Sequence, residues 1–504
     1  MPDTAWSTKL ALAEAMVPLI GRLYRENGVV VTVHGRSLVG KSVIGIVKAH
    51  RFARRLDDVE LPLEPGLELL RVLCRLAPPP ASVDLARLQL HRSGAADAPL
   101  EERVRAALEP VLAAHGGTTT GAGTGAGADA AAGASRDVVL YGFGRIGRLV
   151  ARILLERGDD PHGLRLRAIV VRRGSADDLV KRAALLRRDS VHGAFAGTIT
   201  VDEEGRRIVA NGTAIQVIHS DDPAGVDYAR HGIRDALVID NTGTWRDEEG
   251  LSRHLRSPGA ARVLLTAPGK GAVKNVVHGI NEGTITERDR VVSAASCTTN
   301  AITPVLKAVN DRFGVVHGHV ETVHSFTNDQ NLIDNFHRGD RRGRSAVLNM
   351  VLTETGAARA VAKALPELAG KLTGNSIRVP TPDVSLAILN LTLAQEVSRA
   401  QLNEHLRAMS LESALQDQID YVDSPEVVST DFVGTRKTGV VDALATIAGA
   451  DGAASANVVL YVWYDNERGY SEQVVRVAES LLGVVKPVVP PLRAAAPEPQ
   501  PAGA

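Results

Sequence analysis

The sequence predicts an α/β protein preceded by a mostly helical N-terminal region, and two patterns lead to that prediction. Between about residues 136 and 485, short apolar β-branched runs alternate with longer runs whose apolar residues recur at helical spacing. Such alternation is typical of strands and helices packed in layers. In residues 1–115 the helical spacing dominates, as in the series Leu10, Ala13, Val17, Ile20 and Tyr24.

Two segments of biased composition set the boundaries of these regions. Residues 116–135 read GGTTTGAGTGAGADAAAGAS and offer almost nothing that could be buried, so we predict a flexible linker. Residues 486–504 are rich in proline and alanine, which predicts a disordered tail. A chain of 504 residues is long enough for about three domains.

The overall composition excludes several classes of function. Lys and Arg together number 58, as do Asp and Glu, so no net field favours nucleic acid or an acidic membrane. No uncharged apolar run approaches the roughly 18 residues of a membrane span, and Glu14 interrupts the stretch that a secretory signal would need. The two cysteines, Cys74 and Cys297, indicate thiols in a reducing compartment rather than a disulfide framework. We therefore expect a cytoplasmic protein that binds neither nucleic acid nor membrane, with Cys74 buried on a helix face.

A glycine-lysine run in the N-terminal region raises the question of nucleotide hydrolysis. Residues 35–42 read GRSLVGKS and fit the pattern of a phosphate-binding loop, between the apolar run 29–33 and a predicted helix at 42–52. Hydrolysis also needs an aspartate at the end of a second apolar strand, and we identify no such strand before the linker. We therefore predict a structural turn, with contact to another anion or a partner as the alternative. The role of the region (assembly, partner binding or regulation) stays open.

A second glycine-rich stretch follows the linker. An apolar strand is predicted at 138–141, Gly142, Gly144 and Gly147 form G-x-G-x-x-G, and an amphipathic helix follows at 145–157. The first glycine permits a tight turn, the second lets the backbone approach a pyrophosphate, and the third allows close packing of helix on strand. This context predicts a dinucleotide cofactor.

The next predicted strand, 166–171, ends in Arg172 and Arg173. A carboxylate at this tip would hold the ribose hydroxyls of NAD and repel the extra phosphate of NADP, whereas arginine attracts that phosphate. The alternative is a pair of solvated arginines at a strand end.

A candidate nucleophile lies in VVSAASCTTN, residues 291–300. Cys297 stands where an apolar strand meets a helix, and the positive field of a helix N-terminus favours a thiolate. His324 follows 27 residues later in GHVETVHSFTND, at the end of another strand-like run. Cysteine and imidazole form a common nucleophile-base pair, although spacing alone does not pair these two.

Five motifs, in this order, give the chain a family resemblance: GFGRIGR, ASCTTN, HSFTNDQ, RVPTPDVS and WYDNERGYS. Over about residues 136–485 the chain resembles the phosphorylating glyceraldehyde-3-phosphate dehydrogenases, with an N-terminal extension. The resemblance implies a doubly wound, Rossmann-type NAD(P)-binding domain at 136–296, completed by 466–485. It also implies a catalytic domain at 297–465 with a mainly antiparallel sheet, and a homotetramer acting in glycolysis or gluconeogenesis.

The resemblance implies a reaction in which Cys297 attacks the aldehyde and His324 takes the hydroxyl proton as hydride leaves for the nicotinamide. Inorganic phosphate then cleaves the thioester to an acyl phosphate. The cofactor, NADP or NAD, would contact Gly142, Gly144, Arg145, Ile146, Gly147, Arg172, Arg173, Asn335 and Asn466. The substrate phosphate would contact Thr327, Asp329 and Arg378, and the attacking phosphate Ser296, Thr298, Thr355 and Gly356, with Arg342 nearby. No metal is implied.

Departures from the family pattern bear on the cofactor. Asn335-Phe336 replaces a Leu-Pro pair in a loop that reaches a neighbouring subunit's adenosine end, which leaves room for a 2′-phosphate. Together with Arg172 and Arg173, this favours NADP or dual use. Arg468 replaces a tryptophan and Asn241 replaces a serine, and we draw no functional conclusion from either change.

There are two alternatives to the function of a phosphorylating dehydrogenase. Erythrose-4-phosphate dehydrogenase is a close relative, but Thr327 and the pair Thr355-Gly356 favour the phosphorylating enzyme. A regulatory or scaffold protein with a vestigial site is the alternative from another class. The mapped catalytic positions are intact, which argues against it.

Overall fold

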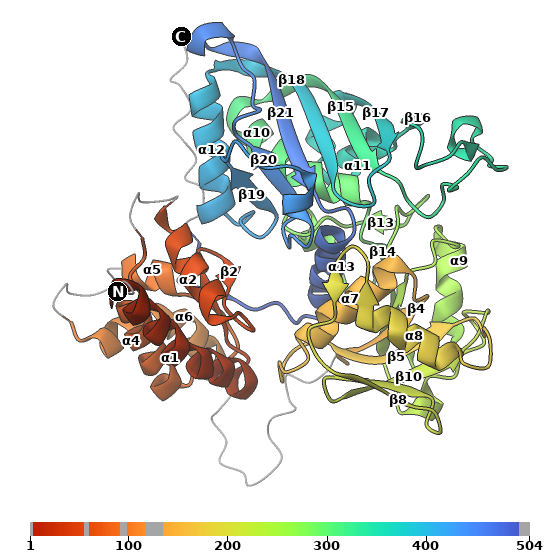
Figure 1. The fold of residues 1–504 in the computed structure, drawn as a ribbon, viewed down its shortest axis with the longest axis horizontal. Coiled ribbons are helices and arrows are strands. Elements are labelled where there is room, and N and C mark those ends of the chain that lie inside the picture. Colours follow the sequence, from red (N-terminus) through yellow and green to blue (C-terminus); the bar gives the residue numbers. More distant parts are fainter. Residues whose placement is uncertain (1–3, 55–59, 91–97, 117–134, 493–504) are drawn as a thin grey trace.

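The computed structural model describes residues 4–54, 60–90, 98–116 and 135–492. Most of the predicted linker and residues 493–504 of the predicted tail lie outside these ranges. Three units are visible in Figure 1: an N-terminal unit of helices with a small sheet, a unit with a large, mostly parallel sheet, and a unit with a second, mainly antiparallel sheet. This architecture confirms the predicted fold class.

The sheet of the dinucleotide-binding unit has nine strands in the order β13-β14-β12-β11-β4-β5-β10-β9-β8. From β13 to β10 all neighbours are parallel, while β9 and β8 are antiparallel additions. Buried Val, Ile and Leu fill the central strands because helices cover both faces. The strands are β4 (Asp137–Tyr141), β5 (Arg165–Val171), β8 (Ile199–Asp202), β9 (Arg207–Ala210), β10 (Thr213–His219), β11 (Ala236–Asp240), β12 (Ala260–Leu265), β13 (Lys274–Asn275) and β14 (Val291–Ser293). The helices are α7 (Arg145–Glu156), α8 (Asp178–Arg187), α9 (Glu248–Ser252) and the returning α13 (Arg468–Leu481), and a short ribbon joins β6 (Arg188–Asp189) to β7 (Gly193–Ala194).

The catalytic unit has a seven-stranded sheet in the order β16-β17-β15-β18-β21-β20-β19. Four of its six pairings are antiparallel, as predicted. Helix α10 (Cys297–Phe313) packs on this sheet through one apolar core. The other elements are β15 (Val315–Ser325), β16 (Val351–Glu354), α11 (Ala357–Ala364), β17 (Leu372–Val379), β18 (Ser385–Val397), α12 (Arg399–Glu412), β19 (Ile419–Val422), β20 (Gly439–Asp442) and β21 (Ser455–Tyr464).

The N-terminal unit has its own apolar core, to which Cys74 contributes as a partly buried thiol. Its helices are α1 (Thr4–Asn27), α2 (Val43–Phe52), α4 (Leu63–Leu76), α5 (Leu85–Leu90) and α6 (Leu100–Gly116), and its strands are β1 (Val30–Val33), β2 (Arg36–Ser37) and β3 (Ser82–Asp84). The sequence predicts no second strand before the linker. That prediction is wrong, because β3 pairs in parallel with β1 and ends in the buried Asp84.

The glycine-lysine run does not form an open phosphate loop. Strand β2 folds back on β1 through a turn at His34 and Gly35, whose φ angles are 46° and 71°, as in a hairpin turn with both central residues left-handed. Gly35 N donates to Asp84 Oδ2 at 2.8 Å, and Lys41 N donates to Leu38 O at 3.2 Å. The N–H groups of Gly35 and Lys41 are therefore used within the unit, which supports the interpretation as a structural turn.

The C-terminal segment joins the N-terminal unit instead of forming a tail throughout. Strand β22 (Val488–Val489) pairs in parallel with β3, and Lys486 is ion-paired with Asp160 of the dinucleotide-binding unit. The prediction of disorder from residue 486 onward is therefore wrong for the first residues of that segment. The prediction relied on composition, which does not show that Val489 is buried in the N-terminal core.

The helices of the described ranges include no segment with the length and apolar character that crossing a membrane requires.

Candidate active site

The glycine loop has the shape that a dinucleotide requires. Gly142 has a φ of 93°, and a Cβ added at Gly147 would lie 2.5 Å from Gly142 O, so helix α7 packs against the strand only because that side chain is absent. A Cβ at Gly144 would meet nothing within 4 Å. The open space lies at the N-terminus of α7, which attracts a pyrophosphate. The loop therefore fits NAD(P).

Arg145 and Ile146 open helix α7, and the Arg145 side chain is held by two carboxylates. It is ion-paired with Glu467 and, at 2.5 Å, with Asp189. The guanidinium of Arg145 is therefore already neutralised, and its backbone N–H at the start of the helix is the group suited to a pyrophosphate.

Cys297 is the first residue of α10, where the local sequence fixes its position. Ser296 caps the helix by accepting a hydrogen bond from Thr299 N at 3.1 Å. Ala295 has a φ of 56°, which is unusual for a residue with a Cβ, and Tyr470 Oη donates to its carbonyl oxygen at 3.0 Å. The chain is thus held in a sharp turn just before the sulfur.

The structure brings the sulfur and the imidazole together. Cys297 Sγ lies 3.5 Å from His324 Nε2. His324 Nδ1 lies 2.7 Å from Ser325 O, which can only accept a hydrogen bond, and 2.9 Å from Arg378 Nη1, which can only donate one. In the tautomer whose Nδ1 is protonated and donates to Ser325, Nε2 is free to accept a proton. This is the tautomer that a base for the thiol needs.

Burial changes the acidity of both groups. It raises the pKa of the Cys297 thiol, although the charge of Arg378 and hydrogen bonds involving Thr298 oppose the change. Burial, reinforced by Arg378, lowers the pKa of His324 to about 3. Burial thus favours the neutral form of each group and opposes the thiolate that a helix N-terminus would stabilise.

The residues predicted for the substrate phosphate converge beside His324. Strand pairing places Arg378 of β17 directly opposite His324 of β15. Arg378 Nη1 lies 3.4 Å from Thr327 Oγ1, Thr327 donates to Asp329, and Arg342 Nη1 is 2.5 Å from Asp329 Oδ2. Two guanidinium groups and a hydroxyl thus face the region of the reacting pair, and both kinds of group are suited to phosphate oxygens.

The residues predicted for the attacking phosphate are divided between two helix N-termini. Ser296 and Thr298 begin α10, and Gly356 precedes α11, which packs on α10 through the same core. Thr298 Oγ1 lies 3.1 Å from Tyr464 Oη, and Thr355 Oγ1 accepts from Ala357 N at 3.2 Å. The predicted contact of the four with one phosphate stays a prediction.

The cofactor-selectivity residues lie at the surface. Arg172 and Arg173 are exposed at the end of β5, as the pattern predicted. Asn335 lies in an exposed loop, where its Oδ1 accepts from the N–H of Phe336 at 2.8 Å. The side chain of Phe336 is 89% exposed.

Asn466 is buried between the two sheet-bearing units. Its Oδ1 accepts a hydrogen bond of 2.7 Å from Ser385 Oγ, which fixes the amide and leaves Nδ2 as a donor. Sequence reasoning missed Tyr464, two residues earlier in the same motif. Its hydroxyl lies 2.6 Å from Thr322 Oγ1 and 3.1 Å from Thr298 Oγ1, so it connects β15 to the nucleophile helix.

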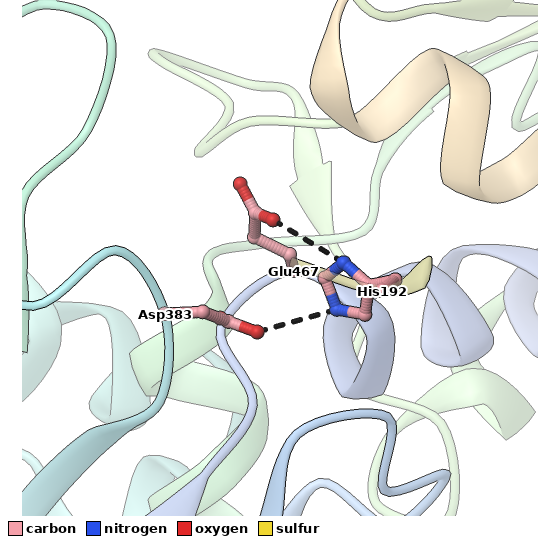
Figure 2. Close-up of side chains that lie close together, drawn as sticks. All are labelled: His192, Asp383 and Glu467. Carbon is pink, nitrogen blue, oxygen red and sulfur yellow. Dashed lines mark ion pairs between the residues drawn. The ribbon is translucent and has the colours of Figure 1, made fainter. Parts of the chain in front are cut away.

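A second missed group is centred on His192, which Figure 2 shows paired with Asp383 and Glu467. His192 Nε2 is 3.2 Å from both Asp383 Oδ2 and Asp465 Oδ2, and its Nδ1 is 3.7 Å from Glu467 Oε2. His192, Asp383 and Glu467 have the spacing of metal ligands. Glu467 already neutralises Arg145, however, and the hydrogen bonds and charges of Asp383 and Asp465 overcome burial and raise the pKa of His192 to about 10. In this structure the group therefore forms an ion-pair network around a protonated imidazole.

Comparisons with known proteins agree with this geometry. The family model described as "Glyceraldehyde 3-phosphate dehydrogenase, NAD binding domain" matches residues 136–248, and that described as "Glyceraldehyde 3-phosphate dehydrogenase, C-terminal domain" matches residues 296–466. A glyceraldehyde-3-phosphate dehydrogenase of Zymomonas mobilis is 41% identical over 345 residues, 68% of this chain and 98% of that protein. Glyceraldehyde-3-phosphate dehydrogenase 1 of Bacillus subtilis is 39% identical over 342 residues, 68% of this chain and 96% of that protein.

One relative also covers the N-terminal unit. A glyceraldehyde-3-phosphate dehydrogenase-like protein of Pseudomonas aeruginosa is 60% identical over 481 residues, 94% of this chain and 100% of that protein. The extension is thus shared with at least one relative. With both family domains matched and the glycine loop, cysteine and histidine in place, the chain belongs to the glyceraldehyde-3-phosphate dehydrogenase family.

Proposed function

We propose that the chain is a phosphorylating glyceraldehyde-3-phosphate dehydrogenase that uses NADP, or both NADP and NAD. The observation that carries the proposal is the 3.5 Å approach of Cys297 Sγ to a His324 whose Nε2 is free to accept a proton. Together with the phosphate-binding groups beside it, this pair suits attack on an aldehyde that carries a phosphate.

The chain's own residues divide the chemistry among them. Cys297 forms a bond to the aldehyde carbon as its proton passes through His324 Nε2 to the carbonyl oxygen, which gives a thiohemiacetal, and Arg378 and Thr327 hold the substrate phosphate. When that carbon gives up hydride, the hydroxyl proton passes back to His324 Nε2, which leaves a thioester on Cys297. Bound NAD(P)+ supplies the hydride acceptor, for which Asn466 Nδ2 is an available donor to the nicotinamide amide. Attack by inorganic phosphate on the acyl-cysteine then releases the acyl phosphate and restores the thiol.

Two features support the finer parts of the proposal. The exposed Arg172 and Arg173 favour a cofactor with an additional phosphate. The loop after β15 exposes large apolar side chains, among them Ile333 at 75%, Leu348 at 79% and Met350 at 75%, which is typical of a subunit contact. We therefore propose a homotetramer like that of the family, acting in the cytoplasm in glycolysis or gluconeogenesis.

The test is an initial-rate assay with glyceraldehyde 3-phosphate, run with and without inorganic phosphate and with each cofactor in turn. We expect phosphate-dependent reduction of NADP that is lost in Cys297→Ser. Turnover independent of phosphate, with erythrose 4-phosphate as the better substrate, would favour the related dehydrogenase instead. Absence of turnover with every combination would favour a regulatory protein.

A further inference from the structure

A cavity of about 630 Å³ lies where the N-terminal unit meets the rest of the molecule. Its walls come from the β1–α2 region of the N-terminal unit, from the C-terminal parts of α7 and α13, and from the loop 434–437. Neither Cys297 nor His324 is among the described residues that line it. The cavity is therefore separate from the proposed active site, and the glycine-lysine run contributes to its wall.

The cavity contains more positive charge than its carboxylates compensate. Lys41 and Lys48 line it, and within the described ranges neither is in an ion pair. Arg436 is only loosely paired, at 3.6 Å from Glu156 and 3.7 Å from Glu472. Both of these carboxylates have closer partners, because Arg468 Nη2 lies 2.7 Å from Glu156 and 3.0 Å from Glu472.

Lys41 shares the cavity with two arginines, Arg36 and Arg436. Burial lowers the pKa of Lys41, and the charges of these two guanidinium groups lower it further, while Glu156 opposes the change. Arg36 is held by Asp420 through two contacts of 2.9 Å, which fixes it in the wall. Like charges held together in a partly enclosed space repel one another, and an anion placed among them would remove that repulsion.

We propose that this cavity binds a phosphorylated small molecule, whose phosphate is held by Lys41, Lys48, Arg36 and Arg436. The proposal differs from a nucleotide-hydrolysing loop, because the backbone N–H groups of Gly35 and Lys41 are used inside the unit. Side chains, in place of a backbone loop, hold the phosphate. This arrangement favours binding of the phosphate without hydrolysis.

The dimensions of the cavity indicate an organic phosphate. Sites for small organic ligands measure roughly 300–1,000 Å³, a range that includes this cavity and far exceeds the needs of a free phosphate ion. Tyr24 and Phe52 contribute aromatic surface to its wall. A sugar or a nucleoside attached to the phosphate would occupy this remaining space.

The site also has a physical connection to the cofactor region. Glu156 ends α7, the helix that begins at the glycine loop, and Glu472 lies on α13, which begins just after Asn466. Arg468 joins the two carboxylates. An anion that attracts Arg436 away from them alters an ion-pair network shared by both helices.

Calorimetric titration of the full-length chain tests the proposal. The protein is first saturated with NADP and inorganic phosphate, so that the proposed active site is occupied, and is then titrated with AMP, ATP and a hexose bisphosphate in separate experiments. We expect one of these to bind at one site per chain and to raise the melting temperature. Which of them binds separates a nucleotide from a sugar phosphate.

Two variants and a matched control assign the binding to the cavity. Lys41→Gln and Lys48→Gln are each expected to weaken binding by roughly tenfold or more, because each removes a charged partner of the phosphate. Arg51→Gln removes a charge from the same helix as Lys48 but outside the cavity, and it should bind like the parent. Melting temperatures measured without ligand identify any variant that is merely unstable.

Three results would overturn the proposal. These are no binding by any of the three compounds, binding that Lys41→Gln and Lys48→Gln leave unchanged, and binding that disappears equally in Arg51→Gln. The first would indicate an interface cavity filled by solvent, and the others an anion site elsewhere on the chain.

Discussion

Arg378 Nη1 lies 2.9 Å from His324 Nδ1 and 3.1 Å from the carbonyl oxygen of Ser325. In the tautomer whose Nδ1 donates to the same carbonyl oxygen, the guanidinium and the imidazole share one acceptor, and Nε2 is unprotonated toward the sulfur. The positive charge beside the ring also disfavours its protonation. A substrate phosphate bound to Arg378 would offset that charge, so substrate binding should make His324 a stronger base.

Arg378→Gln should therefore change both binding and pH dependence. Loss of a charged hydrogen-bond partner costs about 1.5–3 kcal/mol, so the KM for glyceraldehyde 3-phosphate should rise roughly 10- to 150-fold. The pKa of His324, now about 3, should rise toward its ordinary value of about 6.5. Since the neutral ring is the active form, the acid limb of kcat/KM should move to higher pH, which a rate profile measures.

A matched control for this variant is Lys307→Gln, on the exposed face of the nucleophile helix. The pH profile of kcat/KM for this control should be the same as that of the parent. An unchanged acid limb in Arg378→Gln, with only KM altered, would contradict the electrostatic part of the argument.

His324→Asn should lower kcat by roughly 10²–10⁴ while the protein stays folded, because it removes the proton acceptor of Cys297. Alkylation of Cys297 by iodoacetate measures the same interaction without turnover. In the parent, the raised thiol pKa means that alkylation should still increase with pH above the ordinary thiol range. Rapid, pH-independent alkylation near neutrality would show instead that the thiolate is the resting form.

The glycine loop and the two reacting residues could be predicted because short motifs determine them. Gly142 and Gly147 are required by the backbone geometry itself, so the pattern identifies both the turn and the helix that follows. The pairing of Cys297 with His324 came from the family resemblance, since a separation of 27 positions along the chain fixes no distance. The register of β15 against β17, which brings Arg378 to His324, is likewise a tertiary property.

The features that were missed depend on contacts between distant segments. Strand β3 has three residues, too few for a periodic pattern, and it forms because β1 and β22 pair with its two edges. His192 and Asp383 are 191 positions apart, and only the packing of the two sheet-bearing units brings them together. Composition and periodicity report local structure, so such contacts leave no trace in them.

Cofactor preference should reverse when the two exposed arginines are removed. In Arg172→Gln/Arg173→Gln the KM for NADP should rise roughly 10- to 100-fold, since each guanidinium is a charged partner for the 2′-phosphate, while the KM for NAD should change little. Initial rates with each cofactor measure the change. Arg230→Gln, another exposed arginine of the same unit, is the control. Equal effects on NADP and NAD would mean that the arginines act on general electrostatics rather than on the 2′-phosphate.

His192 should contribute to stability in a pH-dependent way. Its pKa is about 10 in the folded protein, where Asp383 and Asp465 hold the charged ring, and about 6.5 in an unfolded chain. A group whose pKa is raised by folding contributes its full stabilisation of the folded protein at pH values below its pKa in the unfolded chain. That contribution is lost as the pH rises through its pKa in the folded protein. His192→Gln should therefore lower the free energy of unfolding by about 3 kcal/mol near neutral pH, because it leaves buried carboxylates without a cation.

Urea unfolding at about pH 7 and about pH 10 separates this contribution from simple loss of packing. The difference between parent and His192→Gln should shrink at the higher pH, where the parent imidazole also loses its proton. His231→Gln, at an exposed histidine, should show no difference at either pH. A destabilisation that is the same at both values would mean that His192 acts by shape alone. Asp465 and Glu467 flank Asn466, so His192→Gln should also raise the KM for the cofactor. This rise in KM and the loss of stability should share one pH dependence, because both follow from the charge of His192.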